Sequence, residues 1–83
     1  MYELRIYKKA EKEIKKIAKL YQKALLEALR EIGENPFAGK PLSRELTGRF
    51  SYRVGPYRII YKVNKKDKLV LVLTAGHRAI VYK

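Results

Sequence analysis

The sequence has 83 residues, enough for one small domain with a layer of helix against one sheet. It contains no cysteine, which excludes a disulfide framework and a thiolate metal site. Twenty Lys and Arg against eight Asp and Glu give a net charge of +12 and a pI of about 10.1. A domain pI above about 9 is typical of nucleic-acid-binding proteins. The alternative is the Lys-rich surface of a heat-adapted protein, although Glu normally rises together with Lys in such proteins.

The apolar runs and the start of the chain indicate where the protein works. The sequence opens directly into patterned residues, without the charged and apolar segments of a signal peptide. Its longest unbroken apolar run, residues 69–73, is far shorter than the roughly 20 residues of a membrane span. We therefore expect a soluble, cytoplasmic protein with no membrane partner.

The first half of the chain changes from a strand period to a helical period. Residues 2–7 alternate Tyr, Leu and Ile with Glu and Arg, which predicts a half-buried strand. Over residues 9–32 apolar side chains recur every three or four positions. One helix of that length would measure about 36 Å, more than the diameter of about 30 Å expected for a compact chain of this size. We therefore expect a break near residues 19–22, a C-cap at Gly33 and no helix beyond Pro36.

The second half of the chain predicts a loop and three strands. Residues 35–47 carry two prolines and a glycine and predict the loop. Alternating patterns predict strands over residues 50–54 and 57–63, and an apolar run predicts a third over residues 69–75. In this third strand Leu69, Leu71 and Leu73 would lie on one face, and Val70, Val72 and Thr74 on the other. A strand that is apolar on both faces belongs inside a sheet.

This order predicts an α+β fold in a single domain over residues 1–83. An N-terminal strand and a helical hairpin precede a three-stranded antiparallel meander, and the helices pack on one face of the sheet. The helices can cover only one of the two apolar sets of the third strand.

The strands over residues 50–54 and 57–63 are joined by Gly55 and Pro56. This pair fits a type II′ turn, because glycine accepts the positive φ of the first central position and proline the negative φ of the second. The resulting register sets Phe50 opposite Tyr61 and Tyr52 opposite Ile59 on the core side. The other side, here called the basic face, sets Arg53 opposite Arg58 and Arg49 opposite Lys62.

Like charges directly opposite each other destabilise a strand pair. Their clustering on the basic face is explained if an anion binds between them, because guanidinium donors match phosphate oxygens. The alternative is that these are ordinary surface charges whose side chains splay into water. We predict that Arg49, Arg53 and Lys62 bind RNA beside Arg58.

The tail after the third strand adds His77, Arg78 and Tyr82, which Gly76 would allow to bend back toward the basic face. Each has an ordinary structural alternative: a surface or capping histidine, a solvated charge and an aromatic ring at the core edge. Neither a carboxylate pair nor a cluster of His and Asp suggests a metal site. We therefore expect neither a metal nor a cofactor.

Three segments, ENPFAGKPL, YRVGPYRIIYKV and GHRAIVY, resemble in this order the RelE/ParE superfamily of toxins from prokaryotic toxin–antitoxin modules. The likeness covers essentially the whole chain. It implies a microbial RNase-like fold and, in the RelE branch, a metal-independent endonuclease that cuts mRNA in the ribosomal A site. It also implies a cognate antitoxin, RelB-like with an acidic segment, alongside the ribosome and mRNA as partners.

The resemblance implies roles for individual residues. Arg58, Arg78 and Tyr82 match the family's catalytic positions, whereas its two basic positions on the preceding strand fall on Ser51 and Arg53, so Ser51 departs from the pattern. Arg58 would stabilise the charge that develops in the transition state, and Arg78 would stabilise the transition state or the leaving 5′-oxygen. Tyr82 would act as general base, because neighbouring cations favour a phenolate, and His77 is the alternative base or acid. The alternative function is that of a ParE-like toxin that binds DNA gyrase and cuts no RNA; a non-toxic RNA-binding domain is a third possibility.

Overall fold

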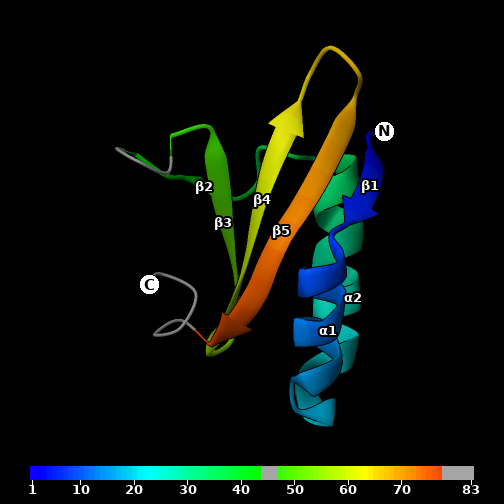
Figure 1. The fold of residues 1–83 in the computed structure, drawn as a ribbon, viewed down its shortest axis with the longest axis vertical. Helices are drawn as coiled ribbons and strands as arrows, with labels where there is room; N and C mark the ends of the chain where they lie inside the picture. The colour runs from blue at the N-terminus through cyan, green and yellow to red at the C-terminus, as the bar shows by residue number, and fades with distance from the viewer. Residues whose placement is uncertain (44–46, 78–83) are drawn as a thin grey trace.

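A computed structural model describes residues 1–43 and 47–77 of the chain. In chain order the elements are β1 (Glu3–Ile6), α1 (Lys8–Lys16), α2 (Lys19–Glu34), β2 (Lys40–Pro41), β3 (Arg49–Val54), β4 (Tyr57–Asn64) and β5 (Leu69–His77) (Figure 1). The predicted α+β order of strand, helical hairpin and meander is confirmed. The two-residue strand β2 lies within the stretch that was expected to be a loop.

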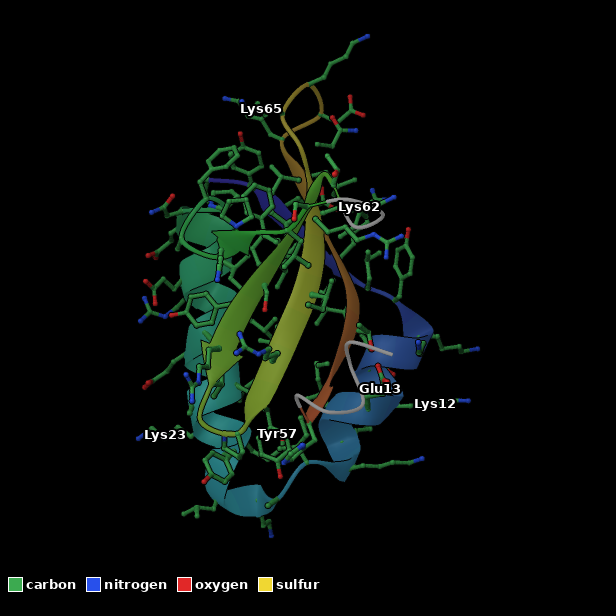
Figure 2. All side chains as sticks on the ribbon, turned by 90° about the vertical axis from the view of Figure 1, so that its left-hand side faces the viewer. Lys12, Glu13, Lys23, Tyr57, Lys62 and Lys65 are labelled. Atoms are coloured by element: carbon green, nitrogen blue, oxygen red, sulfur yellow. The ribbon has the colours of Figure 1, made fainter. Side chains whose placement is uncertain are left out.

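The strands form one sheet in the order β1-β5-β4-β3-β2. β1 runs parallel to β5 at one edge, and the other neighbours are antiparallel, so β5 is an interior strand as predicted. Both helices lie behind the sheet in the view of Figure 2. The core between the two layers consists of Ala10, Ile17, Leu25, Ala28, Leu29 and Ile32 from the helices and Val54, Ile59, Tyr61, Val70, Val72 and Ala75 from the sheet.

The break between the helices falls at Ile17 and Ala18, slightly before the predicted position at residues 19–22. Neither residue has helical backbone, since ψ is 143° at Ile17 and 136° at Ala18. The side-chain amide of Gln22 donates to the carbonyl oxygens of Ile14 and Ile17 at 2.7 and 2.9 Å. Carbonyls at the end of a helix lack intrahelical partners, so Gln22 compensates for the interruption and neither glycine nor proline is needed.

The predicted C-cap at Gly33 is wrong. α2 continues through Glu34, and the C-cap is Asn35, whose N–H donates to the carbonyl oxygen of Glu31 at 2.7 Å. Gly33 is instead buried against the start of the chain, since the N–H of Tyr2 donates to its carbonyl at 3.0 Å. Within the described residues, no helix is long and apolar enough to cross a membrane.

Tyr61 attaches the loop after α2 to the middle of the sheet. Its side chain is fully buried, and its hydroxyl donates to the carbonyl of Pro36 at 2.7 Å and accepts from the N–H of Gly39 at 3.0 Å. A Cβ on Gly39 would lie 2.5 Å from the Tyr61 hydroxyl oxygen, so the close approach of the loop requires glycine. Burial raises the pKa of the Tyr61 phenol, which remains a hydrogen-bond donor.

The pairing of β4 with β5 is irregular in the middle. Ile60 pairs with Thr74 but Tyr61 pairs with Val72, so Leu73 is an extra residue on β5. The predicted division of β5 into two alternating faces is therefore wrong beyond Val72. The buried set is Val70, Val72 and Ala75, while Leu69 and Leu71 are only half-buried.

Replacing Gln22 with Ala should lower the free energy of unfolding by about 1 to 2 kcal/mol, because the variant loses both amide hydrogen bonds and Ile14 keeps only the one from the N–H of Ile17. Urea unfolding followed by circular dichroism measures this loss. Lys23→Ala, an exposed neighbour on the same helix, is the control and should change stability by less than about 0.5 kcal/mol. Equal stabilities of the two variants would show that the Gln22 amide does not stabilise the break.

Candidate functional site

The turn between β3 and β4 sets the register of the candidate site. Gly55 has a φ of +58°, as the first central position of a type II′ turn requires. A Cβ at Gly55 would also lie 2.7 Å from Cε1 of Tyr21 on α2, so the turn packs closely against the helix layer. Tyr21 in turn makes an edge contact with Tyr57, with ring centroids 5.2 Å apart. Helix packing and turn geometry therefore fix the same hairpin.

The predicted pairs of the basic face are present. Arg53 lies opposite Arg58 near the turn, and Arg49 lies opposite Lys62 toward the other end of the hairpin. Arg53 and Lys62 are exposed, whereas Arg49 and Arg58 are half-buried. The structure therefore brings together all four cations on one side of the hairpin.

A neutral pair, Ser51 opposite Ile60, separates the two cationic pairs. These residues are only 3% and 4% exposed, although they lie on the side away from the helices. Nη1 of Arg58 lies 3.5 Å from the Ser51 hydroxyl oxygen, within hydrogen-bonding range. The position at which the sequence departs from the family pattern thus contributes a neutral acceptor that helps to orient Arg58.

A cavity of about 510 Å³ adjoins the basic face at the edge of β3. Its lining comprises Glu31, Ala38, Lys40, Ser51, Tyr52, Arg53 and Arg58. The sequence did not indicate Lys40, which reaches the site because β2 pairs Lys40 with Ser51. A strand of two residues has no detectable period, so no sequence pattern could have placed it there.

Glu31 contributes a carboxylate to this cavity, and the Tyr52 hydroxyl donates a hydrogen bond to it. The bond to Glu31, together with burial and the negative charge, raises the pKa of Tyr52 from 10.0 to about 12. Tyr52 is therefore a neutral donor at physiological pH. The bond links α2 to β3 directly beside Arg53.

The tail residues are only partly within the described ranges. His77 ends β5 opposite Tyr57, and their rings meet edge to face with centroids 6.2 Å apart. Gly76 pairs with Arg58, so His77 lies one residue beyond the partner of Arg58. The imidazole of His77 packs against Tyr57. Arg78 and Tyr82 lie outside the described residues.

The basic face and the adjoining cavity are suited to binding a phosphate backbone. Three cations, Lys40, Arg53 and Arg58, line one concave surface, and arginine presents several donors to phosphate oxygens in a fixed geometry. With Arg49 and Lys62 the positive surface continues along the hairpin. A single-stranded chain could follow such a surface.

Comparison with known families identifies the chain. Residues 4–82 match the family model of the ParE toxin of the type II toxin–antitoxin system parDE. The chain belongs to this toxin family. It is therefore a type II toxin of the RelE/ParE superfamily, as its sequence resemblance implied.

Individual relatives place the toxin near RelE proteins. It is 34% identical to Toxin RelG of Mycobacterium tuberculosis over 84 residues, which cover 99% of this chain and 97% of RelG. The toxin–antitoxin complex RelBE2 of M. tuberculosis contains a chain with a TM-score of 0.84 and 33% identity, covering 93% of this toxin and 98% of that chain. The isolated RelE toxin of E. coli gives a TM-score of 0.79 and 26% identity, with 99% and 92% covered.

The bond between Tyr52 and Glu31 should make stability depend on pH in alkaline solution. Because folding raises the pKa of Tyr52 from 10.0 to about 12, its contribution is complete below pH 10 and is lost as the pH rises toward 12. The Tyr52→Phe variant has no phenol hydroxyl and therefore lacks this pH-dependent contribution to stability. Urea unfolding at about pH 9 and about pH 11 should show the wild type losing more stability than Tyr52→Phe. Parallel losses would mean that the phenol and carboxylate are not coupled.

Proposed function

We propose that this toxin is a ribosome-dependent endonuclease that cuts mRNA in the cytoplasm without a metal ion. The observation that carries the proposal is the placement of Arg58, which is half-buried within hydrogen-bonding range of Ser51 and adjoins Arg53 and Lys40 in one cavity. A partly buried arginine held in position is suited to stabilising charge that develops on a phosphate. The likeness to RelG and to RelE supports the same assignment.

The reaction uses the nucleophile that RNA itself supplies. The 2′-oxygen attacks the adjacent phosphorus, and its proton passes to a general base. The bond from phosphorus to the 5′-oxygen then breaks, and that oxygen takes up a proton. The products are a 2′,3′-cyclic phosphate and a free 5′-hydroxyl, so neither water nor a redox partner is consumed.

The described residues supply binding and electrostatic stabilisation for this reaction. Arg58 binds the non-bridging oxygens of the phosphate as their charge increases. Arg53, which is exposed beside it, holds the neighbouring backbone, while Arg49 and Lys62 bind phosphates further along the hairpin. One preorganised donor of this kind contributes about 100-fold to 1,000-fold in rate.

The proton transfers are assigned to the tail. Tyr82 is proposed as the general base and Arg78 as the group that stabilises the transition state or the leaving 5′-oxygen, both from the family resemblance. His77 is the alternative acid or base. Its edge contact with Tyr57 holds the imidazole at the end of β5, next in sequence to Arg78.

A second candidate function is inhibition of DNA gyrase without RNA cleavage. The observation that favours it is the match to the ParE family model. An inhibitor that acts only by binding needs no group that stabilises a phosphorane, so the two functions differ in their dependence on Arg58. A gyrase supercoiling assay and a ribosome toe-printing assay with the same protein separate them.

Arg58→Ala should reduce mRNA cleavage on ribosomes by about 100-fold or more, because the transition state loses a preorganised cation. Toe-printing with purified ribosomes measures the rate, and circular dichroism verifies the fold. Arg30→Ala, which removes an exposed arginine from α2, is the matched control and should cleave at the wild-type rate. His77→Ala and Tyr82→Phe in the same assay distinguish the two candidate bases.

Cleavage that persists at the wild-type rate in Arg58→Ala contradicts the catalytic assignment. If the wild type arrests growth, leaves mRNA intact and blocks supercoiling, the gyrase function is correct instead. If the Arg58→Ala variant is still toxic and still inhibits gyrase, the conclusion is the same.

An antitoxin is the proposed protein partner. A solved relative is a toxin–antitoxin complex. On this toxin, half-buried Leu69 and Leu71 lie on the side of the sheet away from the helices, and Leu71 pairs with Lys62 of the basic face. An acidic, RelB-like segment could cover this apolar surface and neutralise the cations beside it.

Association with such a segment should be fast and sensitive to salt. Electrostatic attraction between a +12 toxin and an acidic partner raises the association rate by about 10-fold to 1,000-fold at low salt. Stopped-flow mixing with the product of the adjacent small open reading frame, at low and high salt, measures the rates. An association rate that does not change with salt, or a toxin that purifies alone from co-expressing cells, would contradict the proposed partner.

A further inference from the structure

We infer that Glu13, on α1, is a positioning residue for the RNA-cleaving site, which it influences by holding the end of β5. The inference rests on the proposed function. Glu13 itself belongs to the helix layer and does not line the cavity beside Arg58. Figure 2 shows Glu13 on α1, beside the sheet.

The end of β5 extends beyond β1, the parallel strand that pairs with it. β1 stops at Ile6, opposite Val72, and the N–H of Tyr7 makes a further bond to the carbonyl of Val72 at 3.0 Å. Residues 73–77 of β5 continue past this point. Because a buried N–H without a partner costs about 1 to 3 kcal/mol, this stretch requires another source of acceptors.

Glu13 supplies such an acceptor. One oxygen of its carboxylate accepts from the Thr74 hydroxyl at 2.6 Å and from the N–H of Ala75 at 3.1 Å. Ala75 is fully buried, so its N–H is shielded from water. Hydrogen bonds to an ionised carboxylate are roughly twice as strong as neutral ones. α1 is therefore attached to β5 at two consecutive residues.

The attachment occurs where the sheet is irregular. Leu73 is the extra residue of the pairing between β4 and β5, and Thr74 and Ala75 follow it directly. An extra residue of this kind bends the strand and changes where the following side chains point. The bonds from Glu13 fix the first residues after this bend.

The residues beyond the bend lie opposite β4, the strand that carries Arg58. Gly76 pairs with Arg58, and His77 pairs with Tyr57. The chain then continues directly to Arg78. A displacement of about 1 Å at a reacting group can lower a rate about 100-fold, so the hold of Glu13 on β5 controls how well Arg58 is aligned.

Glu13→Ala should lower the cleavage rate at saturating ribosomes about tenfold or more while changing ribosome affinity by less than about twofold, because alignment matters in the transition state. Glu13→Gln retains the side-chain oxygen that accepts both bonds and should keep most of the rate. The control for lost stability is Asn64→Ala, which removes two hydrogen bonds to Asp67 at the other end of the same strand pair. It should cleave at nearly the wild-type rate.

A second readout needs no ribosome. Amide hydrogen exchange of the free toxin should be faster at Thr74, Ala75 and His77 in Glu13→Ala than in the wild type, and nearly unchanged at these residues in Asn64→Ala. Faster exchange confined to these residues shows that the carboxylate holds the strand locally.

Equal losses of cleavage in Glu13→Ala and Asn64→Ala would reduce Glu13 to a structural residue and overturn the inference, as would a wild-type rate in Glu13→Ala. A wild-type toxin that does not cleave mRNA removes the proposed function and the catalytic part of this inference with it. In that case unchanged exchange at Ala75 would overturn the remaining part, the hold of Glu13 on β5.

Discussion

The packing of one helical hairpin on one face of the sheet is the interaction on which the rest of the structure depends. Ile17, Leu25 and Ile32 bury the side chains that β4 and β5 direct toward the helices. Strand alternation then sends every second residue of the β3–β4 hairpin to the opposite side, where the four cations are exposed or half-buried and avoid the full cost of burying a charge. One layer of helix therefore accounts for both the apolar core and the separate positive surface.

The repulsion within that positive surface is tolerated because the register is fixed from the core side. Phe50 stacks on Tyr61, with ring centroids 5.5 Å apart, and the Gly55 turn packs under Tyr21. A one-residue slip would expose these aromatic rings and bury arginines. The neutral Ser51–Ile60 pair also separates Arg53 and Arg58 from Arg49 and Lys62. Stability is thus supplied on one face and charge is concentrated on the other.

The sequence allowed the regular parts of this arrangement to be predicted, because a period of two and a glycine–proline turn determine the pairing of β3 with β4. The irregular parts depend on contacts between distant residues. The extra residue at Leu73 lies beside bonds from Glu13, 61 and 62 positions away in the chain from Thr74 and Ala75. The break at Ile17 depends on the Gln22 amide, and Lys40 enters the cavity through a strand too short to have a pattern.

The pairing of β1 with β5 has a consequence for the synthesis of the toxin. Glu3–Ile6 pair with the stretch from Leu69 to Val72, which is made much later. Contacts between residues so distant in sequence form slowly and only after the loop between them closes. A nascent chain therefore cannot complete the sheet until β5 has left the ribosome. A toxin built this way reaches its folded form, and with it the paired β3–β4 and β4–β5 strands of the basic face, only late in its own synthesis.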